Sequence, residues 1–502
     1  MSSSADRTLK FWSLPTLEPM GMVENQSDVA AAVVFTPEQN AVLVGRMDGS
    51  IDTVTLPEPP ARSEKSSIAA MVNPGLGELM TLNEVEPNNK PEEATPISLP
   101  VTVKGVIQAD TGNDVDLYRF SAKADETWVL DIKAARNKSP LDSRLEVLDA
   151  EGQGVERVRL QAVRETWLTF RGKNSSTSDD FRVFNWEEMT LNQYLYINGE
   201  VVKLWHYPRG PDSGFIVYPG RGNREGFFDT TPLAHPLGQT AYIVEPLASG
   251  VEPLPNGLPV FTLYHENDDA SHRRFGRDSS LTFTAPKDGD FLLRVSDIRG
   301  SQGKAFAYEL VGRAPQPDFK VSLGGLAGAV PKGAGREFNV KVERVDGFNG
   351  PVDIELADLP EGFRVTSPVV VEAGQTMAFG AIYAAADAGE PETPEARVTA
   401  SATVNGETRT IDVKPLGGIK PEAPRKLTVR VEPEELTVAP GQTVTARVVI
   451  ERNGFPGRVE FGKHDSGRNL PHGVYVDNIG LNGLMIPVGQ TEQTFFITAD
   501  PW

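Results

Sequence analysis

The side chains best suited to chemistry are the oxygen donors of one short segment. They are Glu84, Glu86, Asn88 and Asn89. Pro87 keeps this segment out of a helix interior, and in an extended backbone Glu84 and Glu86 point to the same side. Asn113 and Asp116 offer further oxygens later in the chain. Because Ca²⁺ takes about six to eight oxygen ligands with loose geometry, the pattern predicts a calcium site. The alternative is an acidic turn beside a solvated loop.

Extended elements have to position these donors, and the composition favours such elements. The chain of 502 residues contains 47 Gly and 39 Pro, which together make up about 17% of it, above the typical ~12%. This excess is typical of many short strands joined by turns. The length suggests about three or four domains. We therefore expect an all-β, multidomain chain.

Bond-making chemistry has no comparable signal. The sequence contains no His-Glu-x-x-His, Gly-x-Ser-x-Gly or phosphate-loop motif. It contains no cysteine, which excludes thiolate zinc sites, disulfides and cysteine nucleophiles. We therefore expect that the chain is not an enzyme.

The charge balance limits the partners. The formal net charge is −20 and the pI is about 4.9, which argues against nucleic acid, because Lys and Arg drive binding to phosphates. No apolar run approaches the ~18 residues of a membrane span. Residues 1–6 are polar and do not resemble a signal peptide. We expect that an export signal lies upstream and that the chain is a piece of a longer protein.

Two blocks of the chain resemble the bacterial pre-peptidase C-terminal domain, a small jelly-roll-type β-sandwich. The matching pieces are Glu86-Pro87-Asn88-Asn89, Gly105-Val106-Ile107, Asp114 to Phe120, Leu141 to Leu145, Leu148 to Gly152, Leu281 to Pro286 and Phe291 to Val295. The resemblance implies one sandwich over 81–313, interrupted by a β-rich insertion at 157–277.

The same resemblance implies a metal site, because some members of the family bind calcium through these segments. Carried over by position, the ligands are Glu84, Glu86, Asn88, Asn89, Asn113 and Asp116, with Asp114 as a neighbour. The chain has Asn at 89 and 113, where Asp would add charge, so we expect a site of modest affinity. In this family the domain usually follows a secreted enzyme and helps with secretion, adhesion or substrate binding.

The N-terminal residues 1–56 resemble a partial WD-repeat segment, the remnant of a propeller blade. Asp6 to Trp12 matches the end of one repeat, and Val29 to Leu56 matches most of another. A propeller needs about four to eight blades, so the rest would lie upstream. The alternative is a short β-hairpin module. Residues 57–80, rich in Pro and Ser, are expected to form a linker.

The insertion is rich in aromatic residues, with 17 of the chain's 39 in 121 residues. Asn198-Gly199 between two apolar runs predicts a hairpin. Aromatic side chains there either fill a core or stack on sugar rings, and Tyr194, Tyr196 and Tyr242 are the candidates for stacking. The run from His265 to Asp269, with Asp278 nearby, predicts either a second calcium site or a solvated acidic loop.

The C-terminal part repeats itself. Gly347-Phe348-Asn349-Gly350 corresponds to Gly454-Phe455-Pro456-Gly457, an offset of 107 residues. A repeat of this length with alternating strands is typical of immunoglobulin-like sandwiches, and both copies resemble the Ig-like modules of bacterial surface proteins. We expect modules at 315–416 and 425–502, the second cut short, joined by residues 417–426.

Two functions remain open from the sequence. The first is a non-catalytic multidomain β-protein of the bacterial exterior, extracellular, periplasmic or on the cell surface, acting in adhesion or scaffolding with a structural Ca²⁺. The alternative is a carbohydrate- or polymer-binding accessory region of a secreted hydrolase whose catalytic domain lies outside this chain. The expected partner is a polysaccharide or a protein surface ligand.

Overall fold

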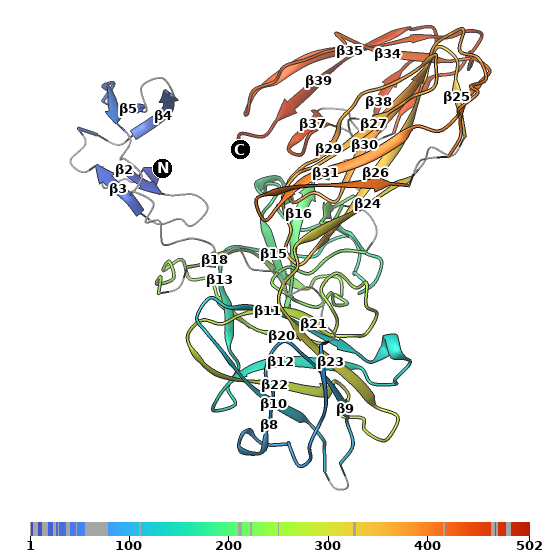
Figure 1. The fold of residues 1–502 in the computed structure, drawn as a ribbon. Helices are drawn as coiled ribbons and strands as arrows, with labels where there is room; N and C mark the ends of the chain where they lie inside the picture. Colours follow the sequence, from blue (N-terminus) through green and yellow to red (C-terminus); the bar gives the residue numbers. More distant parts are fainter. Residues whose placement is uncertain are drawn as a thin grey trace. The chain divides into compact units, whose positions relative to one another are not determined.

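Strands form nearly all the regular structure of this chain in the computed structural model, as Figure 1 shows. The only helices among the described residues are short 3-10 turns. The structure describes residues 2–3, 9–12, 19–23, 27–28, 30–36, 41–46, 48–55, 79–109, 112–208, 213–220, 223–248, 250–324, 328–414, 417–462, 467, 470–477 and 483–502. The predicted all-β, multidomain class is confirmed.

Two compact units divide the chain, Met1–Glu78 and Leu79–Trp502. The first unit contains a sheet of β1 (Ser2–Ser3), β2 (Leu9–Trp12) and β3 (Pro19–Val23), and a sheet of β4 (Ala30–Thr36), β5 (Ala41–Arg46) and β6 (Ile51–Thr55). The propeller-blade remnant stays a prediction. The predicted linker falls almost entirely on residues 56–78, which lie outside the described residues.

The second unit begins with a sandwich of two five-stranded sheets. One sheet has the order β20 (Glu266–Asn267), β12 (Ser143–Asp149), β22 (Gly289–Asp297), β10 (Asp116–Ala122) and β8 (Thr95–Pro96). The other has the order β21 (Ser280–Thr284), β11 (Thr127–Lys133), β23 (Ala307–Arg313), β9 (Val101–Val106) and β7 (Met80–Asn83). Both sheets therefore contain strands from before and after the insertion.

A single core fills the space between these sheets. Strand β9 alternates buried and less buried residues, as expected for a strand with one face toward a core. Phe120 from the first block packs edge-on against Phe283 from the second, with ring centroids 5.9 Å apart. Phe291 lies 5.0 Å from Phe283. The apolar face of each block is thus buried by the other block.

The insertion forms its own seven-stranded sheet. Its order is β14 (Asp180–Phe181), β17 (Phe215–Val217), β16 (Glu200–His206), β15 (Tyr194–Ile197), β18 (Thr240–Leu247), β13 (Glu156–Trp167) and β19 (Val260–Tyr264). The predicted hairpin joins β15 to β16, with positive φ at Asn198 (45°) and Gly199 (100°), as a two-residue turn requires. The inserted sheet spans 156–264 rather than the predicted 157–277, because β20 pairs with β12 of the sandwich.

Two similar modules follow. The first has sheets β24 (Asp318–Gly324)–β26 (Gly335–Val345)–β30 (Met377–Ala384)–β28 (Phe363–Val365) and β29 (Val369–Val371)–β27 (Val352–Ala357)–β31 (Arg397–Val404)–β32 (Glu407–Val413). The second has β34 (Thr428–Glu432)–β35 (Thr443–Glu451)–β39 (Glu492–Ala499)–β37 (Val474–Asp477) and the pair β36 (Val459–Phe461)–β38 (Leu484–Ile486).

The repeat seen in the sequence recurs in the contacts of the two modules. Arg344 Nη1 donates to the carbonyl of Gly350, and Arg452 Nη1 donates to that of Gly457. A side chain at either glycine would contact the phenylalanine two positions earlier at about 3.1 Å. Phe348 and Phe455 therefore occupy equivalent places.

The boundary between these modules differs from the prediction. Residues 417–426 are predicted to connect them, yet Ile419–Glu422 form β33, which pairs with β25 (Gly328–Pro331) of the first module. Ile419 is buried in the core of that module. Because this side chain is buried there, Ile419–Glu422 belong to the first sandwich and not to a connection between the modules.

Candidate metal centre

Three carboxyl groups meet at the edge of the first sandwich. Glu84 and Glu86 follow β7, and Asp116 is the first residue of β10. One oxygen of each lies within 4.8 Å of the others. Among the described residues this is the one group of three acidic or histidine side chains with such geometry. The oxygens of the two segments thus converge, as predicted from the sequence.

Backbone hydrogen bonds hold the two segments in place. The Glu84 amide donates to the carbonyl of Lys104, at 2.9 Å, and Glu84 Oε1 accepts from the Val106 amide, also at 2.9 Å. On the other side the Leu117 amide donates to the Asn88 carbonyl, at 3.1 Å. The segment from Glu84 to Asn88 therefore joins β9 to the start of β10.

Burial raises the pKa of each of these carboxyl groups, most of all that of Asp116, which is the only fully buried one. Burial raises the pKa of Asp116 from its ordinary 3.8 to about 9, and the nearby charges of Glu84 and Asp114 also raise it. Burial likewise raises the pKa of Glu84 and of Glu86, and the charge of Asp114 contributes to both shifts. Without a counter-charge Asp116 therefore keeps its proton near neutral pH.

Several buried oxygens at this place have no hydrogen-bond partner, apart from the proton that the Glu84 and Asp116 carboxyl groups share when no ion is bound. They are Glu84 Oε2, Asp114 Oδ1, Asp116 Oδ1 and the side-chain oxygen of Asn88, whose amide nitrogen is also unpartnered. Asn88 and Asp116 are 0% exposed and Asp114 is 5% exposed. Buried polar atoms normally have hydrogen-bond partners. Unpartnered oxygens beside neighbouring carboxyl groups therefore fit a cation that these oxygens would coordinate.

Two tyrosines orient the deepest carboxyl group. The Tyr308 hydroxyl donates to Asp116 Oδ2, and the hydroxyls of Tyr118 and Tyr308 lie 2.6 Å apart. This pair holds one oxygen of Asp116 and leaves Oδ1 available. A surface cavity of about 490 Å³ reaches Glu84 and Tyr308 and offers an entry path for an ion.

The predicted ligand set is only partly brought together. Glu84, Glu86 and Asp116 meet as expected, and Asn88 is buried with unpartnered side-chain atoms. Asn89 Oδ1 accepts instead from the Val115 amide, at 2.9 Å, and Asn113 is exposed.

Asp114, assigned from the sequence only as a neighbour, is the residue that sequence reasoning undervalued. It is buried, its Oδ2 accepts from the Gln108 amide at 2.5 Å, and its Oδ1 is free of partners. Its place in the acidic Asn-Asp-Val-Asp run was the available signal.

The raised pKa values predict how calcium and pH act together. In chelator, Asp116 binds a proton in the folded chain that the unfolded chain releases above pH 3.8. This extra proton contributes to the free energy of unfolding of the calcium-free chain. The contribution is present at low pH and is lost as the pH rises toward about 9. Calcium replaces the proton, so the increase in melting temperature caused by calcium should grow from pH 5.5 to pH 8.5. Calorimetry in calcium and in chelator measures it, and Asp116→Asn should abolish the trend. An increase that does not vary with pH would contradict this assignment.

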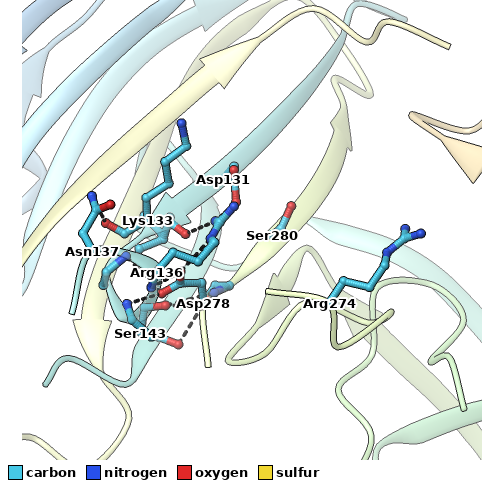
Figure 2. A network of polar contacts seen from close by, with 12 residues as sticks. Asp131, Lys133, Arg136, Asn137, Ser143, Arg274, Asp278 and Ser280 are labelled. Atoms are coloured by element: carbon cyan, nitrogen blue, oxygen red, sulfur yellow. Dashed lines mark hydrogen bonds and ion pairs between the residues drawn. The ribbon is translucent and has the colours of Figure 1, made fainter. Parts of the chain in front are cut away.

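The second acidic cluster has protein partners instead. Glu266 pairs with Arg144 at 2.6 Å, and Asp269 pairs with Arg273 at 3.1 Å. Asp278 accepts from the amides of Ala134, Ala135 and Arg136 at 2.6–3.0 Å and from Arg136 Nε at 2.7 Å. Figure 2 shows Arg136 between Asp131 and Asp278. These contacts join the end of the insertion to the sandwich, and they support the acidic-loop alternative over a second calcium site.

The aromatic residues suggested for sugar stacking are packed in the insertion. Tyr196 stacks on Phe261 with centroids 3.9 Å apart, and Tyr242 lies 5.3 Å from the same ring. Tyr194 packs against Phe227 at 5.4 Å. All three tyrosines belong to one apolar cluster, as the core alternative predicts.

A buried ion network surrounds Glu200, the first residue of β16 in the β15–β16 hairpin. Glu200 accepts from Arg224 Nε at 2.5 Å, from His235 Nε2 at 2.7 Å and from the Leu233 amide at 2.7 Å. The side chains of Arg224, Glu200 and His235 are fully buried. Nothing in the local sequence joins these three residues, which are separated by 24 and 35 positions from Glu200.

Comparisons with known proteins give little beyond this geometry. No profile of a known family and no curated protein sequence matches the chain. Domains 4–9 of the surface layer protein SbsC are similar at 14% identity and a TM-score of 0.19, over 61% of this chain and 42% of that structure. Domains 1–6 of SbsC are similar at 12% identity and a TM-score of 0.19, over 65% of this chain and 37% of that structure. A DUF4785 family protein from Legionella pneumophila is similar at 8% identity and a TM-score of 0.16, over 78% of this chain and 85% of that structure. The chain thus spans less than half of either SbsC structure, and TM-scores this low establish no shared architecture.

Proposed function

We propose that this chain is a non-catalytic, multidomain β-protein of the bacterial cell exterior that acts in adhesion or scaffolding and carries a structural Ca²⁺. The observation that carries the proposal is the meeting of Glu84, Glu86 and Asp116 within 4.8 Å of one another, with buried unpartnered oxygens around them. The pre-peptidase-like sandwich would be the calcium-binding module.

The donor chemistry favours calcium over other metals. Every candidate ligand is a carboxylate or amide oxygen, and no imidazole or thiolate is among them. Hard oxygen ligands suit Ca²⁺ and Mg²⁺, and donors brought from different segments suit the flexible coordination of Ca²⁺ better than the strict octahedron of Mg²⁺. Glu84, Glu86, Asp116, Asp114 and Asn88 would hold the ion, and waters would complete its shell.

The ion would supply charge neutralisation and a cross-link. Glu84 and Glu86 directly follow β7, the first strand of the second unit. Asp116 begins β10 in the opposite sheet. An ion bound to both would therefore join the two sheets at the point where the chain enters the sandwich, which is where a pull on the N-terminal part of the chain would be transmitted.

The wider organisation supports a role in adhesion or scaffolding. The sandwich, the insertion and two similar modules follow one another, and each has its own apolar core. No helix among the described residues is long and apolar enough to cross a membrane. We place the protein outside the cell or in the periplasm, with a polysaccharide or a protein surface as partner.

Stretching single molecules of the full chain tests this role. We expect the unfolding of one sandwich to need a higher force in calcium than in chelator, because the ion joins its two sheets. Glu86→Ala should lose the difference, and Glu92→Ala, a nearby exposed carboxylate, should keep it. Equal forces in both buffers, or turnover of ester, peptide or glycoside substrates by the chain, would contradict the proposal.

The second candidate function is the polymer-binding accessory region of a secreted hydrolase. A specific observation favours it, which is that large aromatic side chains of the insertion are exposed. Trp167 and Phe184 are 40% and 42% exposed, although neither was singled out as a stacking residue from the sequence.

A further inference from the structure

Two exposed aromatic rings lie against each other on the insertion. Trp167 and Phe184 are stacked with centroids 4.0 Å apart and planes 11° apart. Their backbones are joined, since the Phe184 amide donates to the Trp167 carbonyl at 3.0 Å. Phe170, 56% exposed, follows Trp167 closely, and Leu237 is 61% exposed beside the same segment. An exposed group of large apolar side chains of this kind marks a binding surface.

A polar cavity begins where this aromatic group ends. It has a volume of about 500 Å³ and is lined by Arg171, Gly172, Lys173, Asn174, Thr177, Ser178, Asp179, Asp180 and His235. Arg171 and Gly172 directly follow Phe170, and Leu237 lies two residues after His235. Lys173 and His235 form a β-bridge. The same two chain segments therefore carry both the rings and the cavity.

His235, in the lining of this cavity, has a ring nitrogen without a hydrogen-bond partner. It is 2% exposed, and its Nδ1 has no hydrogen-bond partner. Its Nε2 lies 2.7 Å from Glu200 Oε2 and must supply the hydrogen, because the carboxylate can only accept. In the neutral ring Nδ1 is then an acceptor, and no group among the described residues donates to it.

The charges of the cavity favour a neutral occupant. Lys173 Nζ lies 3.2 Å from Asp180 Oδ1, and Arg171 lies 3.3 Å from Asp180 Oδ2. The two cations share this one carboxylate, and Asp179 also lines the cavity, so the formal charges of these four side chains balance and leave little attraction for an anion. Asn174 and Thr177 add groups that can both donate and accept.

We propose that this surface binds a neutral polysaccharide, with a sugar ring stacked on the outer face of Trp167 or of Phe184 and hydroxyl groups hydrogen-bonded to the exposed polar side chains of the cavity. Sugars present apolar C–H faces to aromatic rings and hydroxyls at their edges, so they match both halves of the surface. The inference rests on the proposed adhesive role and names its ligand class. It is independent of the proposed calcium site, whose residues belong to the sandwich.

Affinity electrophoresis of the full chain tests the inference, in gels that contain soluble β-glucan, xyloglucan, glucomannan, galactomannan or starch. We expect at least one polymer to slow the protein. Trp167→Ala with Phe184→Ala should weaken that binding at least about tenfold, equivalent to about 1.4 kcal/mol. Phe496→Ala removes a similarly exposed ring, 41% exposed, from the last module and should bind like the original chain.

Other outcomes would overturn it. No retardation by any polymer, or retardation that survives the double substitution, would remove the sugar site. Flotation with phosphatidylglycerol vesicles that depends on Trp167, without retardation in the gels, would assign the rings to a lipid surface. Unchanged binding by Arg171→Met, which alters an exposed residue of the cavity, would remove the polar half of the site. Calcium-dependent melting, measured on the same samples, would still report on the proposed function separately.

Discussion

Calcium added to the chelator-treated full chain should stabilise its first sandwich by about 2.7 kcal/mol when free calcium is 100 times the dissociation constant. The physical reason is mass action, because only the folded state brings Glu84, Glu86 and Asp116 together. Hydrogen–deuterium exchange in increasing urea, followed at the amides of β11, which carries the core residue Trp128, measures the gain in this sandwich. Calorimetric titration supplies the dissociation constant.

Substitutions at exposed positions separate this effect from nonspecific charge screening. Glu86 is exposed, so Glu86→Ala should spare the fold and remove most of the gain. Glu92→Ala changes the charge equally at another exposed position and should retain the gain. Asn113→Ala should also retain it, since Asn113 is exposed, whereas Asp114→Asn should reduce it. Unfolding curves that coincide in calcium and chelator would leave the acidic turn as the correct interpretation.

Arg224→Met should destabilise the insertion by about 3–5 kcal/mol, because it leaves the buried Glu200 carboxylate without its strongest partner. Arg224 contacts both oxygens of Glu200, at 2.5 and 3.0 Å, and both side chains are 0% exposed. Hydrogen–deuterium exchange of the amides of β16, which contains Glu200, and of its neighbour β15 reports the local loss of stability.

A surface arginine of the same insertion is the matched control. The Arg171 side chain is 59% exposed and pairs with Asp180 at 3.3 Å, so Arg171→Met should change stability by less than about 1 kcal/mol. Adding Glu200→Gln to Arg224→Met removes the unpaired charge and should recover part of the loss. Losses that simply add in the double variant would show that an unpaired charge is not the cause.

Local patterns were sufficient to predict the strands. Alternation in β9 and the Asn198-Gly199 turn depend on neighbouring residues alone, since the strand period and the sign of φ are local properties. The duplicated Gly-Phe-x-Gly segments could be recognised for the same reason, and the Arg344 and Arg452 contacts agree with them. The closeness of Glu84 and Glu86 in the candidate metal centre also follows from one extended segment.

Only the tertiary structure decided which residues complete each site. The start of β10 buries Asp114 and Asp116 and leaves Asn113 exposed, and no pattern in that short run specifies this choice. Arg224, Glu200 and His235 meet because distant segments pack together, and Trp167 stacks on Phe184 through a pairing that joins β13 to the segment after β14. Burial and pairing between distant segments depend on how the sheets assemble, so the sequence alone determines the elements and the assembled fold determines their partners.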